Sequence, residues 1–247
     1  MRLNKSLGIK LLGVAALAFA LTCSLQAQTV PGKAEVRALK GVAVYSTGGG
    51  PSMPLKVGTV LGPGSTVKTG AGSSVDLFLG NSAGIVRLTE NTTLSIDKLT
   101  LTDTGADTAV EVQLNLPDGT MLGNVNKLSA ASRYEIKTPN GVAGIRGTKF
   151  RMGANGFIVL TEGTMVFVYV PGGNQNPTPY TLAAPPPVYF SPTAGVQPAP
   201  QDLVTEVKSQ FGGGPPFTPP GPPSGVPFRE PFVSPGLGKG TVGSPPK

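Results

Sequence analysis

Histidine and tryptophan are absent from this 247-residue sequence, and its single cysteine is Cys23. Without histidine, the most common general base of hydrolytic enzymes is missing. A lone cysteine cannot form an intramolecular disulfide or a thiolate metal cluster. Charged residues are also few, at 13% of the chain. These absences argue against an enzyme, and we expect no catalytic residues, no metal site and no cofactor.

Positive charge is in small excess. The chain has 20 basic and 13 acidic residues, a formal net charge of +7. Three of the basic residues, Arg2, Lys5 and Lys10, lie in the first 27 positions, so the remainder carries 17 basic against 13 acidic residues, or +4. No basic run is long enough to follow a phosphate backbone. We therefore expect no nucleic-acid partner.

The first 27 residues have the pattern of an export signal. Arg2 and Lys5 precede a mostly apolar stretch over residues 11–25, and the sequence turns polar at Gln26. This pattern predicts a signal peptide over 1–27 with cleavage after Ala27. The apolar run is shorter than the roughly 20 residues that span a bilayer, which disfavours an uncleaved anchor. We expect an exported, periplasmic or extracellular protein with no transmembrane span after signal removal; a lipoprotein anchored at Cys23 is the alternative.

Residues 34–170 are predicted to form one all-β domain of many short strands. Apolar and polar residues alternate there, and Gly, Asn, Asp or Ser interrupt the alternation at intervals of about 8–12 residues. Polar members such as Asp76 are expected to face water. A β-sandwich-like fold, a curled β-solenoid and a partly open barrel all fit this pattern. The predicted strands are 36–45, 66–69, 74–79, 85–88, 93–96, 98–102, 110–116, 121–125, 134–137, 149–152, 157–161 and 165–170.

Composition changes after Val170, where 20 of the 26 prolines lie. Proline removes a donor from a strand ladder, so the interior of a sheet cannot continue there. Residues 171–211 are predicted to be an extension with edge strands at 180–182 and 188–190 and one short C-terminal helix over 202–211. Asp202 is the expected cap of this helix, and Gly212 its end. Residues 212–247 are predicted to be a disordered Pro/Gly-rich tail that acts as a spacer.

Two short motifs resemble catalytic or metal-binding patterns. Residues 80–84 read G-x-S-x-G, but the next segment is a predicted strand and the chain has no histidine, so we interpret them as a loop between strands. Asp103 and Asp107 could share a calcium ion, although their spacing fits no known loop, and acids in a polar turn are the simpler interpretation.

A basic pair occurs in the predicted strand 149–152. Alternation points Phe150 and Met152 inward and leaves Lys149 and Arg151 facing solvent. An ordinary strand explains this pattern, and these two basic residues are also candidate partner-facing residues.

The segment Thr138–Phe150, TPNGVAGIRGTKF, is the most distinctive in the chain. Its proline and glycines are expected to force an irregular crossover with close backbone approach, while Val142 and Ile145 supply apolar contacts. Arg146 is expected to tie loop carbonyls together, with binding of an acidic ligand as the alternative.

This segment resembles the late signature of the FecR-domain family. Glycine-punctuated stretches at 58–61, 64–70 and 74–77, and later ones at 116–119 and 163–168, extend the resemblance over about 40–170. The insertion at 48–50 and the turn at 81–84 depart from the family pattern. The residues that match the family signature, and that we expect to be mainly structural, are Thr138, Pro139, Gly141, Val142, Gly144, Arg146, Gly147, Thr148 and Phe150.

Relatives of FecR are envelope regulators, and this chain resembles their outer domain alone. The resemblance implies a non-catalytic, exported protein-interaction or sensing module of the bacterial envelope, whose partner would be another envelope protein. The alternative is a structural or glycan-associated cell-surface protein, bound to cell wall or glycan and carrying a proline-rich spacer.

Overall fold

The computed structural model describes residues 28–103, 107–171 and 176–212. The chain divides into two compact units, 1–217 and 218–247, and the second lies wholly outside the described residues. The predicted signal peptide 1–27 and the predicted tail beyond Gly212 also lie outside them. The fold is therefore that of residues 28–212.

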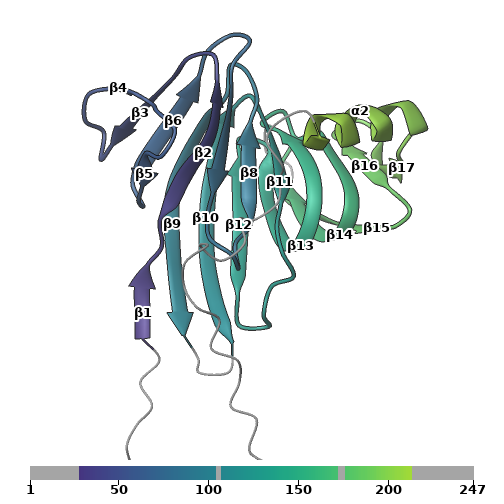
Figure 1. Cartoon of the computed structure of the whole chain (residues 1–247). Coiled ribbons are helices and arrows are strands. Elements are labelled where there is room, and N and C mark those ends of the chain that lie inside the picture. The colour runs from purple at the N-terminus through teal and green to yellow at the C-terminus, as the bar shows by residue number, and fades with distance from the viewer. Residues whose placement is uncertain (1–27, 104–106, 172–175, 213–247) are drawn as a thin grey trace, which may run out of the picture. The chain divides into compact units, whose positions relative to one another are not determined.

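Seventeen strands and one helix make up the described residues (Figure 1). The strands are β1 Gln28–Pro31, β2 Ala34–Lys40, β3 Ala43–Thr47, β4 Met53–Pro54, β5 Val60–Leu61, β6 Ser65–Thr69, β7 Ser74–Phe78, β8 Ile85–Leu88, β9 Thr93–Asp103, β10 Thr108–Asp118, β11 Thr120–Asn124, β12 Arg133–Thr138, β13 Gly141–Gly153, β14 Ile158–Tyr169, β15 Thr178–Ala184, β16 Val188–Ser191 and β17 Gly195–Pro198. The helix is α2, Gln201–Gly212. The prediction of an all-β fold with one short C-terminal helix is confirmed.

All of these strands belong to one sheet that curls on itself, and its pairing divides at β13. The first half of β13 pairs with β12, which leads through β10, β9 and β6 to β3. The second half pairs with β11, which leads through β8 and β7 to β2. On its other side β13 pairs along its length with β14. The ladders are antiparallel except for that of β10 with β12, and the strands form one curled, barrel-like sheet.

One hydrophobic core joins both branches. Alternate residues of the strands supply it, as the period-two pattern predicts. Among the side chains with no exposed surface are Leu77 and Leu88 from one branch and Leu94, Leu114 and Ile136 from the other. The two branches thus bury their inner faces against each other.

Strand boundaries differ from the predicted ones where a turn or a bulge intervenes. The predicted strand 36–45 is two strands, β2 and β3, because the backbone turns at Gly41 with φ of 76°. Conversely, 93–96 and 98–102 form the single strand β9, and 157–161 and 165–170 form the single strand β14. Register shifts between paired strands let these long strands bend without ending.

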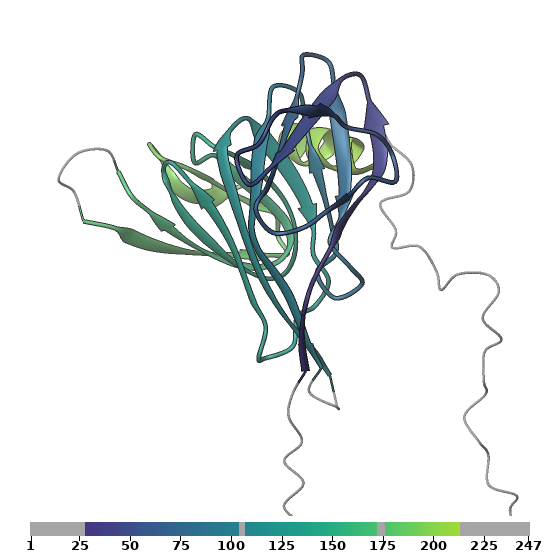
Figure 2. The ribbon, with the colours of Figure 1, turned by 90° about the vertical axis from the view of Figure 1, so that its left-hand side faces the viewer.

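Both predicted edge strands of the extension are present. Strand β15 pairs with the second half of β14, and β16 pairs with the first half and then with β17. Figure 2 shows the β14–β15 hairpin extending to one side of the curled sheet. The extension therefore continues the same sheet.

Helix α2 begins one residue earlier than predicted. The backbone N–H of Val204 donates to the carbonyl oxygen of Pro200 at 3.0 Å, which places Asp202 in the first turn rather than at the cap. An acidic side chain there still interacts favourably with the positive end of the helix dipole. The helix packs on the outer side of the sheet across β13 and β14 (Figure 1).

Candidate interaction surfaces

The Thr138–Phe150 segment is a hairpin turn followed by a strand, and the predicted irregular crossover is wrong. Thr138 ends β12, and its hydroxyl donates to the carbonyl of Gly141 at 3.2 Å. The side-chain amide of Asn140 donates to the carbonyl oxygen of Ala154 at 2.8 Å, which ties the turn to the far end of β13. The remaining residues pair with β14, with register shifts between Ile145 and Thr148 and between Lys149 and Phe150.

Two of the glycines in this segment are needed for close backbone approach. Gly141 has a φ of 150°, and a Cβ there would collide with the carbonyl oxygen of Val168. Gly147 has a φ of 77°, and its Cβ would lie 2.8 Å from the Cα of Lys127. At Gly144, by contrast, the nearest atom to a Cβ would be the carbonyl oxygen of Val166 at 3.8 Å. Sequence reasoning grouped all three together, but only Gly141 and Gly147 are constrained.

The inward side of the segment belongs to the core. Phe150 has no exposed surface, and its ring fills the space above Gly123, where any side chain would collide with it. Ile145 and Thr148 are also buried, whereas Val142 is half-buried. Pro139 lies in the turn between β12 and β13. Ile145, Thr148 and Phe150 are thus held in the core by packing.

The outward side presents Arg146, which is exposed. Arg146 forms no hydrogen bond or ion pair with the described residues, so the expected tie to loop carbonyls is not present. The other four arginines of the described part are each ion-paired: Arg37 with Glu35, Arg87 with Asp76, Arg133 with Glu135 and Arg151 with Glu206. Among the described arginines, Arg146 is thus the one whose guanidinium donors have no partner.

A shallow hollow of ≈ 240 Å³ lies beside Arg146. Arg133 and Glu135 of β12 form one wall, Gly144 lies between the strands, and Val166 of β14 lies opposite. The hydrogen bond from Arg133 to Glu135, 2.8 Å long, raises the pKa of that guanidinium. Two guanidinium groups against one carboxylate leave this hollow with an excess of positive charge.

The two predicted partner-facing residues already have partners within the chain. The ammonium group of Lys149 lies 2.9 Å from a carboxylate oxygen of Glu162 on β14. A guanidinium nitrogen of Arg151 lies 3.7 Å from a carboxylate oxygen of Glu206 in α2, and 27% of the Arg151 side chain is exposed. Their neighbours Phe150 and Met152 point inward as predicted. Arg146 is consequently better placed than Lys149 or Arg151 to meet a partner.

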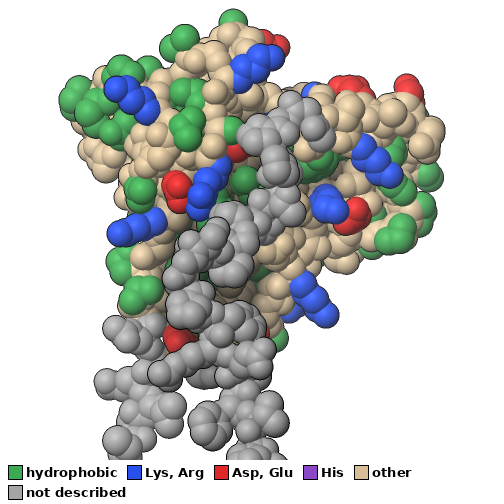
Figure 3. All heavy atoms as spheres, in the orientation of Figure 1, with side chains coloured by type: hydrophobic (Ala, Val, Ile, Leu, Met, Phe, Trp, Pro, Cys, Tyr) green, Lys and Arg blue, Asp and Glu red, His purple; other side chains and the backbone are tan. Residues whose placement is uncertain are grey.

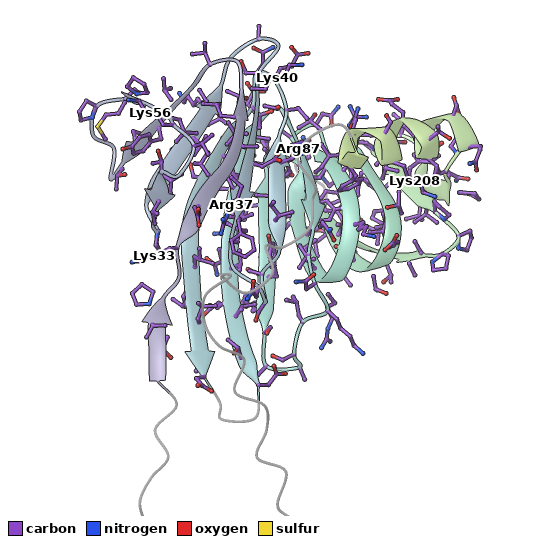
Figure 4. The ribbon with its side chains drawn as sticks, in the orientation of Figure 1. Lys33, Arg37, Lys40, Lys56, Arg87 and Lys208 are labelled. Atoms are coloured by element: carbon purple, nitrogen blue, oxygen red, sulfur yellow. The ribbon has the colours of Figure 1, made fainter. Side chains whose placement is uncertain are left out.

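Asp76 is buried, which corrects the prediction that it faces water. Its carboxylate receives two hydrogen bonds from Arg87 of β8, at 2.6 and 2.7 Å. A third donor of Arg87 reaches the carbonyl oxygen of Gln210 in α2 at 2.6 Å. Figure 4 shows Arg87 beside the end of the helix. The opposite charges at directly paired positions of a hairpin were the available sequence signal for this pair.

A separate apolar surface lies at the β3–β5 end of the sheet. Met53, Val57 and Val60 are 43%, 60% and 54% exposed there. Figure 3 shows hydrophobic side chains gathered in this region, at the upper left of the view. Met53 lies in β4, Val60 in β5 and Val57 in the loop between these two strands, all of them after the glycine-rich insertion at 48–50.

Two further observations bear on the class of protein. Within residues 28–103, 107–171 and 176–212, no three acidic, cysteine or histidine side chains gather as metal ligands would. The same residues contain no helix that is both long and apolar enough to cross a membrane.

The family comparison agrees with the segment that is distinctive in the sequence. A family model described as FecR protein matches residues 65–174, which run from β6 to just beyond β14. No curated protein and no solved structure has a significant match to this chain. The matched residues include the hairpin of β12 and β13, the bulge at Gly147 and the exposed Arg146. The match over residues 65–174 therefore confirms the resemblance of this part of the chain to the FecR-domain family.

Proposed function

We propose that this chain is a non-catalytic, exported protein-interaction module of a sensing system in the bacterial envelope. The FecR family is associated with sensing and regulation at the envelope, which supports this assignment. The absence of histidine from the sequence disfavours most general acid–base chemistry. A recognition role needs an accessible surface with unsatisfied binding groups rather than a catalytic cleft.

The observation that carries the proposal is the state of Arg146. It lies in the family signature, yet it is exposed and leaves its donors unused among the described residues. Its glycine neighbour Gly147 and the buried Thr148 are explained by packing, but packing does not explain an arginine at position 146. Arginine offers five donors in a fixed planar fork, which suits bidentate recognition of a carboxylate.

The surface around Arg146 adds a place for an apolar group. Val166, on the neighbouring strand, is 43% exposed, and the half-buried Val142 and Val168 are paired with each other across β13 and β14. We therefore assign to this face a protein partner that presents an acidic side chain next to an apolar one. The face combines an anchor for charge with a small hydrophobic area, as protein interfaces commonly do.

Site-specific photo-crosslinking in the native host tests the proposal. A photoreactive residue at position 146 of the full-length chain is expected to give one discrete protein adduct in the envelope fraction. The same residue at the exposed Lys68, on β6, serves as the matched control and should give none. Equal labelling from both positions, or no adduct from either, would contradict the proposal.

Two further outcomes are informative. Export predicts that the chain is recovered outside the cytoplasm with Gln28 as its first residue, and recovery from the cytosol with residues 1–27 intact would overturn that part. Retention on purified cell-wall material without a protein adduct would favour the alternative, a structural or glycan-associated surface protein.

A further inference from the structure

A single row of directly paired residues crosses the sheet beneath α2. The ladder registers place Asp76 of β7 opposite Arg87 of β8, Arg87 opposite Leu122 of β11, Leu122 opposite Arg151 of β13, and Arg151 opposite Val159 of β14. Paired residues on neighbouring strands point to the same face of a sheet. This row, which we call the helix-facing row, therefore lies on the outer face of five consecutive strands.

The apolar contacts under α2 form a small cluster separate from the main core. Leu122 and Val159 have no exposed surface, and Val204 and Val207 of the helix are 2% and 0% exposed. None of these four belongs to the contiguous core between the two branches. The cluster is small, because only two valines of the helix are fully buried in it. Burial of a few such side chains is a modest stabilisation for an ordered element.

The two arginines of the row provide polar contacts at defined places along the helix. Arg87 donates to the carbonyl oxygen of Gln210 in the last turn, where helix carbonyls lack intrahelical donors. The last turn of α2 has no basic residue of its own. Arg151 lies 3.7 Å from Glu206, one turn earlier. The row therefore recognises general features of an amphipathic helix: an acidic side chain, two small apolar ones and a C-terminal carbonyl.

The polar fit between α2 and the sheet is incomplete. Arg151 Nε and Gln210 Oε1 are both buried and have no hydrogen-bond partner among the described residues. An unsatisfied buried donor and acceptor each weaken an interface. Isolated helices of about a dozen residues are also marginal in water, so α2 depends on this docking for its order. The helix is accordingly held less firmly than the strands beneath it.

We propose that the helix-facing row is a helix-binding site, occupied by α2 in the isolated chain and available to an amphipathic helix of a protein partner that displaces α2. The partner helix would carry small apolar residues three positions apart, an acidic residue over Arg151 and a C-terminal turn over Arg87. This site lies on a different part of the sheet from the hollow at Arg146. A negative result at one site therefore does not contradict the proposal for the other.

A synthetic peptide of residues 201–212, labelled with a fluorophore, is the probe. In the Val207→Asp variant of the full-length chain, a buried carboxylate should undock α2 and vacate the site. The peptide is expected to bind this variant at least ten-fold more tightly than the wild-type chain, as measured by fluorescence anisotropy. The Lys208→Asp variant, which changes the exposed neighbouring residue, is the matched control and should behave like wild type. A peptide carrying Val207→Asp should not bind.

A second variant, Glu206→Lys, tests the same site if the Val207→Asp variant does not fold. Glu206→Lys places a like charge beside Arg151, so it should loosen α2 without putting a charge into the apolar cluster.

Hydrogen exchange of the wild-type chain should show α2 amides exchanging at least ten-fold faster than those of β13. A folded variant that fails to bind the peptide, α2 amides as protected as β13, or a wild-type dimer that exchanges α2 between copies would overturn the proposal.

Discussion

The carbonyl oxygen of Gly147 occupies the space in which a side chain at Gly163 would begin. Both residues have positive φ, 77° and 88°, and they lie where β13 and β14 slip in register. The two backbones can approach this closely because Gly163 carries no Cβ, whereas a Cβ at Gly147 would meet the backbone of Lys127 instead. The glycine of the family signature and the glycine that opens the closing stretch 163–168 are thus the two halves of one contact.

This contact predicts different effects of two alanine substitutions on the free energy of unfolding. Gly163→Ala should destabilise the domain by roughly 3 kcal/mol or more, because it adds both a backbone collision and an unfavourable φ. Gly144→Ala, in the same hairpin, has open space and an ordinary φ, so it should be neutral or stabilise by about 0.5 kcal/mol. Urea unfolding of the two variants measures the difference. Similar losses for both would show that the bulge is not what requires glycine.

The buried pair of Asp76 and Arg87 gives a second prediction. Arg87→Ala leaves the Asp76 carboxylate, with a side chain only 4% exposed, without its partner. The expected cost is about 3–5 kcal/mol, as for other buried pairs from which one partner is removed. Arg133→Ala, which breaks the exposed pair with Glu135, should cost less than about 1 kcal/mol.

The double variant Asp76→Leu with Arg87→Met separates charge burial from shape. It removes both charges, so stability should return to within about 1–2 kcal/mol of wild type. Hydrogen exchange in α2 should remain fast in the double variant, because the donor to the Gln210 carbonyl is still missing. Recovery of stability together with full protection of α2 would show that Arg87 does not hold the helix.

The period-two pattern predicted most of the sheet because each strand is short and one face of it is buried. Strand β8 was predicted at its observed bounds, and β6, β7, β10, β11 and β12 to within two residues at either end. The bulge at Gly147 was missed because alternation alone does not reveal where a strand bends. The sequence also did not predict that β13 pairs with β12 along its first half and with β11 along its second half. Pairing between segments that are distant in the sequence leaves no local pattern.

The candidate sites were predictable to different degrees. The signature segment stood out by its glycines, but sequence alone could not separate the constrained Gly141 and Gly147 from the unconstrained Gly144. Asp76 was expected in water because alternation assumes that the outer face is solvated. Helix α2 covers that face from more than 120 residues away in the sequence, so the burial of Asp76 is a tertiary effect. Arg146 was expected to tie loop carbonyls together, but it forms no such hydrogen bond among the described residues, because its side chain points to solvent.

Tyr134 introduces a dependence on alkaline pH. Its side chain is 2% exposed, and its hydroxyl has no hydrogen-bond partner among the described residues. Burial raises the pKa of this phenol well above its usual value, because the phenolate would be poorly solvated. The unfolded chain loses this proton near pH 10, whereas the folded chain keeps it. Stability is therefore fully present below about pH 10 and falls as pH rises beyond it.

Tyr134→Phe should abolish this loss. At pH 8 the variant should be as stable as wild type or more stable by about 1 kcal/mol, because it removes an unsatisfied buried hydroxyl. Above pH 10 the wild-type chain should lose about 1.4 kcal/mol per pH unit that the variant does not lose. Urea midpoints at pH 8 and pH 11 measure the effect, with Tyr45→Phe, at a half-buried tyrosine, as the control. Parallel losses in wild type and Tyr134→Phe would mean that residue 134 ionises in the folded chain as readily as in the unfolded one.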